Sequence, residues 1–250
     1  MSVGEIVAVA LAGLAAGAIN TLVGSGTLIT FPVLLAFGYA PVRANVSNTI
    51  GLAPGNASGA IGYRRELAGQ RARALRLGVA SVAGGATGAV LLLVLPASAF
   101  KAIVPLFIAL ALVLVVLQPR LVRFLADRRI DLEQGGVLVA LAVYLSGVYG
   151  GYFGAAQGIL LLGVLGAALA QDLQRTNALK NVLVGLVNGV AGVYFALAAH
   201  VDWGPAAIIA CASILGAQLG ARYGRRLPAN GLRALIVAVG VFAIVHLLVE

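Results

Sequence analysis

The stretch VGSGTLITFP, from Val23 to Pro32, decides the fold because it interrupts a long apolar run near the start of the chain. It places glycines, hydroxyl side chains and a proline where a lipid-facing helix would carry none. A helix in hydrocarbon satisfies its backbone hydrogen bonds internally, and a break is tolerated only where it contacts protein or lines a cavity. The stretch therefore predicts two helices that meet at a break.

Composition places the chain among integral membrane proteins. Of its 250 residues, 61% are apolar and 10% are charged, and the mean hydropathy is +1.04, which is far from the mix of a soluble domain. The apolar runs are continuous rather than alternating, which predicts helices and not a transmembrane β-barrel. No basic residue precedes Glu5, so we expect the first run to be a retained span rather than a signal peptide.

Cysteine usage and net charge exclude several classes of partner. A single cysteine, Cys211, leaves no disulfide framework, thiol relay or cysteine-rich metal site, and we expect no metal and no cofactor. The net charge of +9 would suit nucleic acid, but basic residues in the short loops of a membrane protein set its orientation and contact anionic lipids. We therefore expect membrane lipids, and no nucleic acid, as partners.

The chain matches itself at an offset of 132 residues. The matching pairs that are hardest to explain by composition are Arg43 with Arg175, Asn45 with Asn177, Asn56 with Asn188, and Leu95-Pro96 with Leu227-Pro228. The match predicts two repeats, residues 1–118 and 135–250, joined by a basic cytoplasmic linker at 119–134.

The basic residues indicate how the repeats are oriented. If each repeat crosses the membrane five times, 15 of the 17 lysines and arginines, Lys180 among them, fall on one side and only Arg43 and Lys101 on the other. If each crosses four times, the split is 9 to 8. The positive-inside rule favours the first arrangement. Because five is odd, we expect an all-α polytopic membrane protein with about ten transmembrane segments in a 5+5 inverted repeat, with both termini outside the inner membrane.

Polar residues gather in the first three segments of each repeat. The fourth and fifth are aliphatic, and the fourth has the small-residue spacings Gly84–Gly88 and Gly216–Gly220, which suit close helix packing. We expect discontinuous helices near Gly24–Gly26 and Gly154–Gly158. A helix that restarts at such a break presents free N–H groups and the positive end of its dipole, which favour an anion. A plain glycine hinge or a loop between spans would leave the same pattern.

The candidate substrate-binding residues lie at or beside these breaks. They are Asn20, Ser25, Gly26, Thr27, Arg43, Asn48, Thr49, Gln157, Gly158, Asn177 and Asn181. Amides and hydroxyls can bind an oxyanion without a fixed charge, and Arg43 would attract it. Asparagines also join membrane helices by hydrogen bonds, and an arginine near the interface also reaches toward headgroups. Arg175 and Lys180 are interpreted mainly as residues that set the topology.

The acidic residues favour an anion as cargo by where they are missing. All eight fall in predicted loops or at span ends. A cation pump or a proton relay usually needs a carboxylate inside the membrane.

Several stretches resemble the TauE/SafE sulfite exporter family, also called the toluenesulfonate uptake permeases. In the first repeat they are AGAINTLVGSGTLITFPVLLAFGYAP (16–41) and ANVSNT (44–49). In the second they are GVYGGYFGAAQGILLLG (147–163), RTNALKN (175–181) and HVDWGPAAIIACASILGAQLGAR (200–222). The resemblance covers essentially the whole chain.

This resemblance implies a bacterial inner-membrane transporter, not an enzyme, for small anions such as sulfite, sulfonates or carboxylates, running without ATP. We expect alternating access as the repeats rock about a midplane site. A coupling proton or sodium ion and a homodimer are left open as partners. The alternative is an anion channel with a continuous polar pore. A membrane enzyme would need a nucleophile, metal cluster or cysteine pair, and the sequence offers no such constellation.

Overall fold

The computed structural model describes residues 1–127, 136–169, 171–224 and 229–249, and in these ranges it contains ten helices and no strand. The helices are α1 (Val3–Leu22), α2 (Thr27–Ala36), α3 (Pro41–Gly62), α4 (Arg71–Val94), α5 (Ala97–Asp127), α6 (Val137–Tyr152), α7 (Gln157–Ala168), α8 (Leu173–Ala198), α9 (Trp203–Tyr223) and α10 (Ala229–Val249). In α1, α4, α5, α8 and α9, the described residues are long and apolar enough to cross a membrane. The chain is a multi-pass membrane protein, as its composition predicts.

Both predicted breaks are present. Helix α1 begins with a capping box between Ser2 and Glu5 and ends at Leu22, and the chain reverses through Gly24, whose φ of +86° suits glycine. The second break lies between α6 and α7, where Gly154 has a φ of +79°. The sequence therefore predicted both interruptions at the correct residues.

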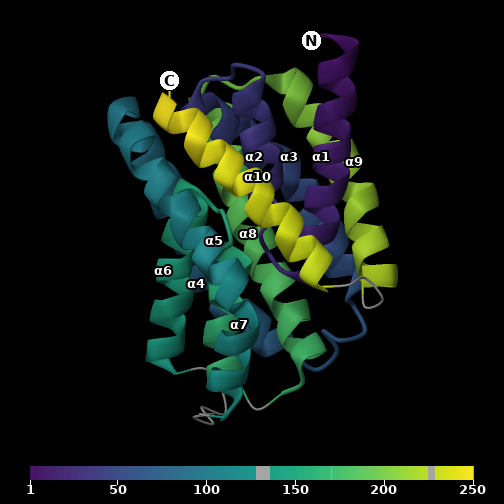
Figure 1. Ribbon diagram of the computed structural model, residues 1–250. Helices are drawn as coiled ribbons and strands as arrows, with labels where there is room; N and C mark the ends of the chain where they lie inside the picture. The colour runs from purple at the N-terminus through teal and green to yellow at the C-terminus, as the bar shows by residue number, and fades with distance from the viewer. Residues whose placement is uncertain (128–135, 170, 225–228, 250) are drawn as a thin grey trace.

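The two short helices differ from the expectation that every segment crosses the membrane. With 10 and 12 residues and a rise of 1.5 Å per residue, α2 and α7 are about 15 and 18 Å long, against about 30 Å of hydrocarbon. Helix α2 returns to the end of the molecule where α1 begins (Figure 1), and there the Tyr39 hydroxyl donates to Glu5 Oε1 at 2.6 Å. Thus α1 and α2 form a hairpin.

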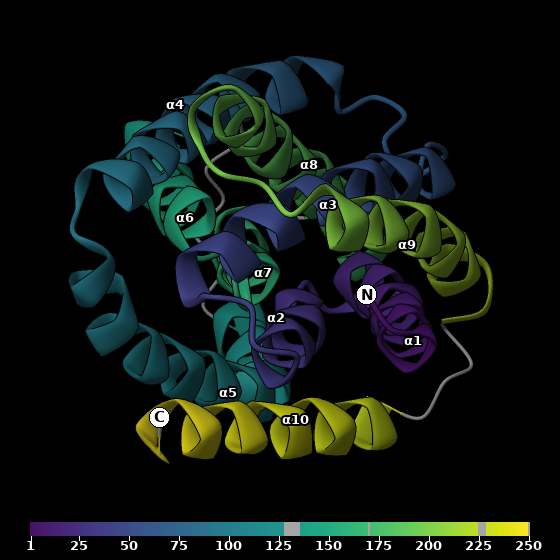
Figure 2. The same cartoon turned by 90° about the horizontal axis from the view of Figure 1, so that it is seen from above.

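Helices far apart in sequence make the main contacts. Helix α1 packs along α9, and α4 packs along α6. Glycines allow the close approach, since a Cβ at Gly84 would overlap the Tyr144 carbonyl and one at Gly216 would overlap the Leu14 carbonyl. The close packing predicted from the Gly84–Gly88 and Gly216–Gly220 spacings is confirmed. Seen along the bundle (Figure 2), α2 and α7 lie inside a ring formed by the other helices.

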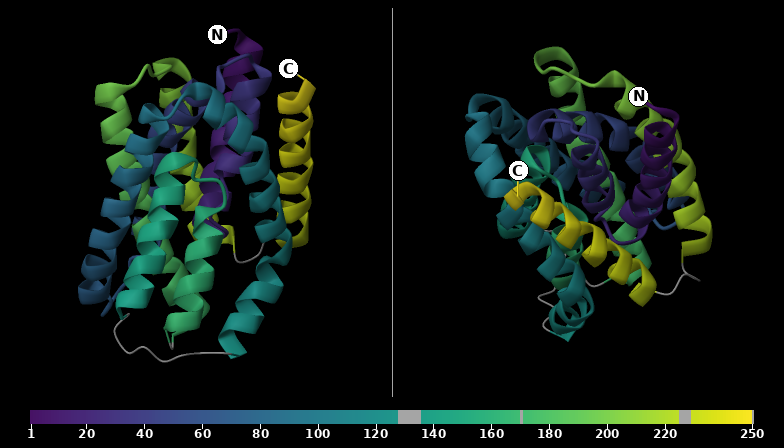
Figure 3. Two further views of the ribbon diagram at one scale, coloured as in Figure 1. Left: turned by 90° about the vertical axis from the view of Figure 1, so that its left-hand side faces the viewer. Right: turned by 45° about the horizontal axis from the view of Figure 1, so that its top comes forward.

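The two ends of the bundle differ in charge. Both termini lie at one end (Figure 3), which we call the N/C end and which also holds Tyr39, Arg43 and Asp202. The opposite end, called the basic end, holds the last turn of α3 and the first turns of α4 and α8, where Arg175 donates to the Ala68 carbonyl at 2.9 Å. The exposed or half-exposed arginines of the basic end include Arg64, Arg65, Arg71, Arg73, Arg76, Arg175 and Arg222.

The predicted linker at 119–134 is partly helical. Helix α5 continues through residue 127, so the end of the first repeat predicted at residue 118 falls inside a helix. Residues 128–134 lie outside the described part of the chain.

Candidate functional site at the two helix breaks

The two breaks touch each other in the middle of the bundle. The Gly158 amide, near the start of α7, donates to the Gly24 carbonyl at 3.1 Å. A Cβ at Gly24 would overlap the Gly158 Cα, and one at Gly158 would overlap the Gly24 Cα. Only glycine fits on both sides of this contact, so the backbones of the two breaks meet directly.

The start of α2 is tied to the end of α1 and to α3. Asn20 Oδ1 accepts the Gly26 amide at 3.2 Å, and Asn20 Nδ2 donates to Asn56 Oδ1 at 2.6 Å. Asn48 of α3 accepts a hydrogen bond from Thr30 and donates to Thr27 Oγ1 at 3.4 Å. These predicted site residues are buried together around the first break.

Helix α8 supplies donors to the carbonyl end of α1. The side-chain amides of Asn177 and Asn181 donate to the Thr21 carbonyl at 3.0 and 3.2 Å. Lys180 Nζ donates to the carbonyls of Asn20 at 2.8 Å and Thr21 at 3.3 Å. The last carbonyls of a helix have no partner within it, and α8 provides three donors for them.

Lys180 does not lie where the sequence interpretation placed it. As a topology determinant it would face the basic end, but its side chain is fully buried and reaches the first break. Asn177 carries a distance-independent signal that was used, its alignment with Asn45. Lys180 aligns with Asn48 at the same offset of 132 residues, and this alignment with a candidate residue was the signal that could have identified it.

The second break is built from α6 and α3. Asn45 Nδ2 donates to the Tyr152 carbonyl at the end of α6 at 3.0 Å, and Thr49 donates to the Asn45 carbonyl at 2.9 Å. Thr49 therefore turns back on its own helix in this conformation. Ala156 adopts a left-handed φ of 60° just before α7, and Gln157 packs so closely on Gly150 that a Cβ there would overlap its amide.

Buried polar atoms without a protein partner are found at both breaks. Ser25 is 0% exposed and Gln157 is 1% exposed, yet Ser25 Oγ and both polar atoms of the Gln157 amide have no hydrogen-bond partner. Ser25 follows Gly24 and Gln157 precedes Gly158, so the two side chains flank the backbone contact. Buried polar groups are usually satisfied, and these two retain donor capacity for another molecule.

The predicted helix-start cradle is partly occupied in this conformation. The Gly158 amide is bonded to Gly24, the Gly26 amide to Asn20, and the Gln157 amide to the Gly154 carbonyl at 3.3 Å. The side chains of Ser25 and Gln157, rather than these three backbone amides, are the unpaired donors.

Arg43 lies apart from the breaks. It forms an ion pair with Asp202 at the N/C end, where its side chain is 45% exposed, and the Asp202 amide donates to Ser47 Oγ at 2.9 Å. Burial and the hydrogen bond to Glu5 raise the pKa of nearby Tyr39 to about 12. Of the eleven candidate residues, Arg43 is the one that the structure places away from the breaks.

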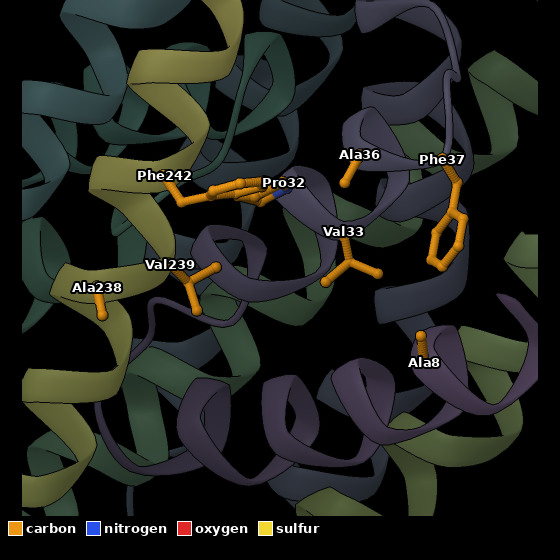
Figure 4. Close-up of a pocket in the computed structure, with 8 residues that line it drawn as sticks. All are labelled: Ala8, Pro32, Val33, Ala36, Phe37, Ala238, Val239 and Phe242. Carbon is orange, nitrogen blue, oxygen red and sulfur yellow. The ribbon is translucent and has the colours of Figure 1, made fainter. Parts of the chain in front are cut away.

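Two pockets lie elsewhere in the molecule. One, of about 390 Å³, lies between α1, α2 and α10 and is lined by apolar side chains alone, including Pro32, Val33 and Phe242 (Figure 4). It offers no side-chain donor for an anion. The other, of about 700 Å³, lies at the basic end and is lined by Arg64, Arg65 and Arg222 with Glu66 and Gln218.

Comparison with known proteins identifies the family. The family model described as sulfite exporter TauE/SafE matches residues 9–247. The chain belongs to this family. The TauE/SafE match extends over nine of the ten helices in full or nearly in full and includes both breaks. No solved structure matches the chain at a significant level.

Curated relatives of this TauE/SafE chain carry the name of probable membrane transporters. A "probable membrane transporter protein ORF9" of Sinorhizobium sp. is 30% identical over 247 residues, which cover 96% of this chain and 91% of the relative. YfcA of Escherichia coli K12 is 26% identical over 83% of this chain and 76% of its own. A Haemophilus influenzae relative is 28% identical over 84% and 81%. The resemblance to the family is confirmed, and the chain is a membrane transporter by family.

Proposed function

We propose that this TauE/SafE chain is a secondary transporter that binds a small oxyanion, such as sulfite or a sulfonate, where its two helix breaks meet. The observation that carries the proposal is the pair of unpaired buried polar side chains, Ser25 and Gln157, on either side of the Gly24–Gly158 contact. Hydroxyl and amide donors suit the oxygens of such an anion, and neutral donors hold it weakly enough for release.

The packing of the helices supports a 5+5 inverted repeat. The α1–α9 contact corresponds to the α6–α4 contact when each helix is exchanged for the one five places along. In this proposal α1–α2 and α6–α7 enter from opposite faces as hairpins, and the last three helices of each repeat change sides. The basic end then faces the cytoplasm by the positive-inside rule, and the N/C end faces outward.

Alternating access follows if the contact between the breaks opens toward each end in turn. The basic pocket near Arg64, Arg65 and Arg222 would concentrate anions at the inner mouth. Direct backbone contact at Gly24 and Gly158 favours a carrier over a continuous pore, because it closes the path between the breaks in this conformation.

A binding and flux experiment tests the proposal. Purified protein is screened for thermal stabilisation by sulfite, thiosulfate, taurine, sulfoacetate and lactate, and a stabilising anion is then followed in proteoliposomes. Saturable uptake with counterflow is expected for a carrier. Flux that neither saturates nor shows counterflow would instead indicate a channel.

Two substitutions locate the site. Ser25→Ala and Gln157→Leu remove unpaired buried groups, so each should leave the unfolding temperature unchanged or raise it while weakening anion binding at least about tenfold. Ser81→Ala is the matched control: Ser81 is equally buried, but its hydroxyl donates to the Leu183 carbonyl at 3.0 Å. This control should lower stability and retain binding. Unchanged binding in both site variants would contradict the proposed location.

A further inference from the structure

Lys180 places a charged group in the centre of the bundle. Its side chain is fully buried, and its stem crosses the second break, since a Cβ at Gly158 would lie 3.0 Å from Lys180 Cδ. Its ammonium group then reaches the first break and donates to the carbonyls of Asn20 and Thr21. One side chain thus spans the point at which the two breaks touch.

No carboxylate balances this charge in the described part of the chain. The ion pairs found there are Met1–Glu5 and Arg43–Asp202, both at the N/C end. Asp172 caps the start of α8 by accepting the Arg175 amide. What Lys180 has instead is the carbonyl end of α1, whose dipole amounts to about half a negative charge.

An ammonium group in this position is costly to keep. Removing a charge from water costs several kcal/mol even after relaxation, and ionisable residues within membrane segments usually mark a pathway or a binding site. A negative ligand beside Ser25 and Gln157 would complete the neutralisation that the α1 carbonyls begin. Ser25 and Gln157 neighbour the same Gly24–Gly158 contact that the lysine stem crosses.

The charge is present in one repeat only. At the offset of 132 residues Lys180 corresponds to Asn48, which is also buried but neutral and contacts Thr27 and Thr30 of α2. The described residues at the contact between the breaks therefore contribute a single positive charge.

We propose that Lys180 is the charge-compensating residue of the anion site, and that its single charge selects singly charged oxyanions over doubly charged ones. The inference rests on the proposed function and adds the charge class of the cargo. Sulfonates and hydrogensulfite carry one negative charge, whereas sulfate carries two and would leave one uncompensated in the bundle.

Three probes of similar shape separate charge from size: dimethyl sulfone is neutral, methanesulfonate carries one negative charge, and sulfate carries two. Binding to purified full-length protein is measured by thermal shift and calorimetry. The wild-type chain should prefer methanesulfonate. Lys180→Met should weaken methanesulfonate binding about 30-fold or more while leaving dimethyl sulfone binding little changed. Lys101→Met, the same substitution at an exposed lysine, is the matched control and should bind like the wild type.

A second variant tests the count of charges without removing Lys180. Asn48→Lys adds a cation at the equivalent position of the first repeat and should shift the preference from methanesulfonate toward sulfate. If Lys180→Met fails to fold, this shift still decides the question. Wild-type binding of methanesulfonate with unchanged charge preference in the variants would overturn the role of Lys180 and leave the proposed function standing. A wild-type chain that binds no anion, in this set or the earlier screen, would overturn both.

Discussion

The two breaks have the same plan but differ in how their carbonyl ends are satisfied. At the first break, Asn177, Lys180 and Asn181 of α8 all donate to the last carbonyls of α1. At the second, Asn45 of α3 donates to the Tyr152 carbonyl of α6. The difference suggests that the first break is strongly held and carries the charge, whereas the second depends on one neutral amide and can change shape more easily.

Replacing the glycine of the first break should have the largest effect. Gly24→Val forces a β-branched residue to a φ of +86° and places its Cβ on the Gly158 backbone. The strain and the overlap together should cost roughly 2–6 kcal/mol. At the second break, a Cβ at Gly154 would lie 3.0 Å from the Gly150 carbonyl, so Gly154→Val should cost less. Folded yield and unfolding temperature measure both, and equal losses would contradict the difference in crowding.

The capping amides should differ in the same direction as the number of donors. Asn45→Leu leaves the buried Tyr152 carbonyl without its side-chain donor and should cost about 1–3 kcal/mol. Asn177→Leu should cost less, because the Thr21 carbonyl keeps Asn181 and Lys180. Unfolding temperatures of the two variants provide the comparison. A larger loss for Asn177→Leu would show that the first break is the weaker one.

The ion pair at the N/C end should matter little for the site. Arg43→Gln removes a half-exposed pair with Asp202, and such pairs contribute about 0–1 kcal/mol. Anion affinity should stay within about threefold of the wild type, since the charge at the breaks comes from Lys180. Titration calorimetry with methanesulfonate measures this. A loss as large as that of Lys180→Met would return Arg43 to the site.

The smallest expected effect concerns the clamp on the first hairpin. Tyr39→Phe removes the hydrogen bond to Glu5 and should cost about 0.5–1 kcal/mol near neutral pH. Because the pKa of Tyr39 is raised from 10 to about 12, its contribution is complete below about pH 10 and is lost as the pH rises toward 12. The stability difference between the two proteins should therefore narrow across that window. Denaturation midpoints at pH 8, 10 and 11.5 test it, and a constant difference would contradict the shift.

The local features of the fold could be predicted from sequence because glycine and proline disturb an apolar run at the residues where the helices end. The breaks near Gly24 and Gly154 and the close packing at Gly84 and Gly216 are of this kind. The return of α2 to the end where α1 begins could not be predicted, because a run of ten apolar residues does not specify the direction in which it leaves a break.

The site was predicted in part for a related reason. Ser25, Gln157 and Asn177 stand in conspicuous places beside the glycines, and the structure brings all three to the breaks. Lys180 was misjudged, because a lysine near a basic loop is usually at the interface, and only the three-dimensional contact with Asn20 and Thr21 shows that it points inward. Arg43 was misjudged for the opposite reason, since its partner Asp202 is 159 residues away in sequence.

The contact between α1 and α9 has a consequence for biogenesis. The glycine-lined face of α1 receives its partner only after about 180 further residues have been made, since α1 ends at Leu22 and α9 begins at Trp203. At about 5–20 residues per second, this interval lasts on the order of 10–40 s. During that time the first helix of the nascent chain must rest against lipid or the insertion machinery, and a chain terminated before Trp203 would leave it there permanently.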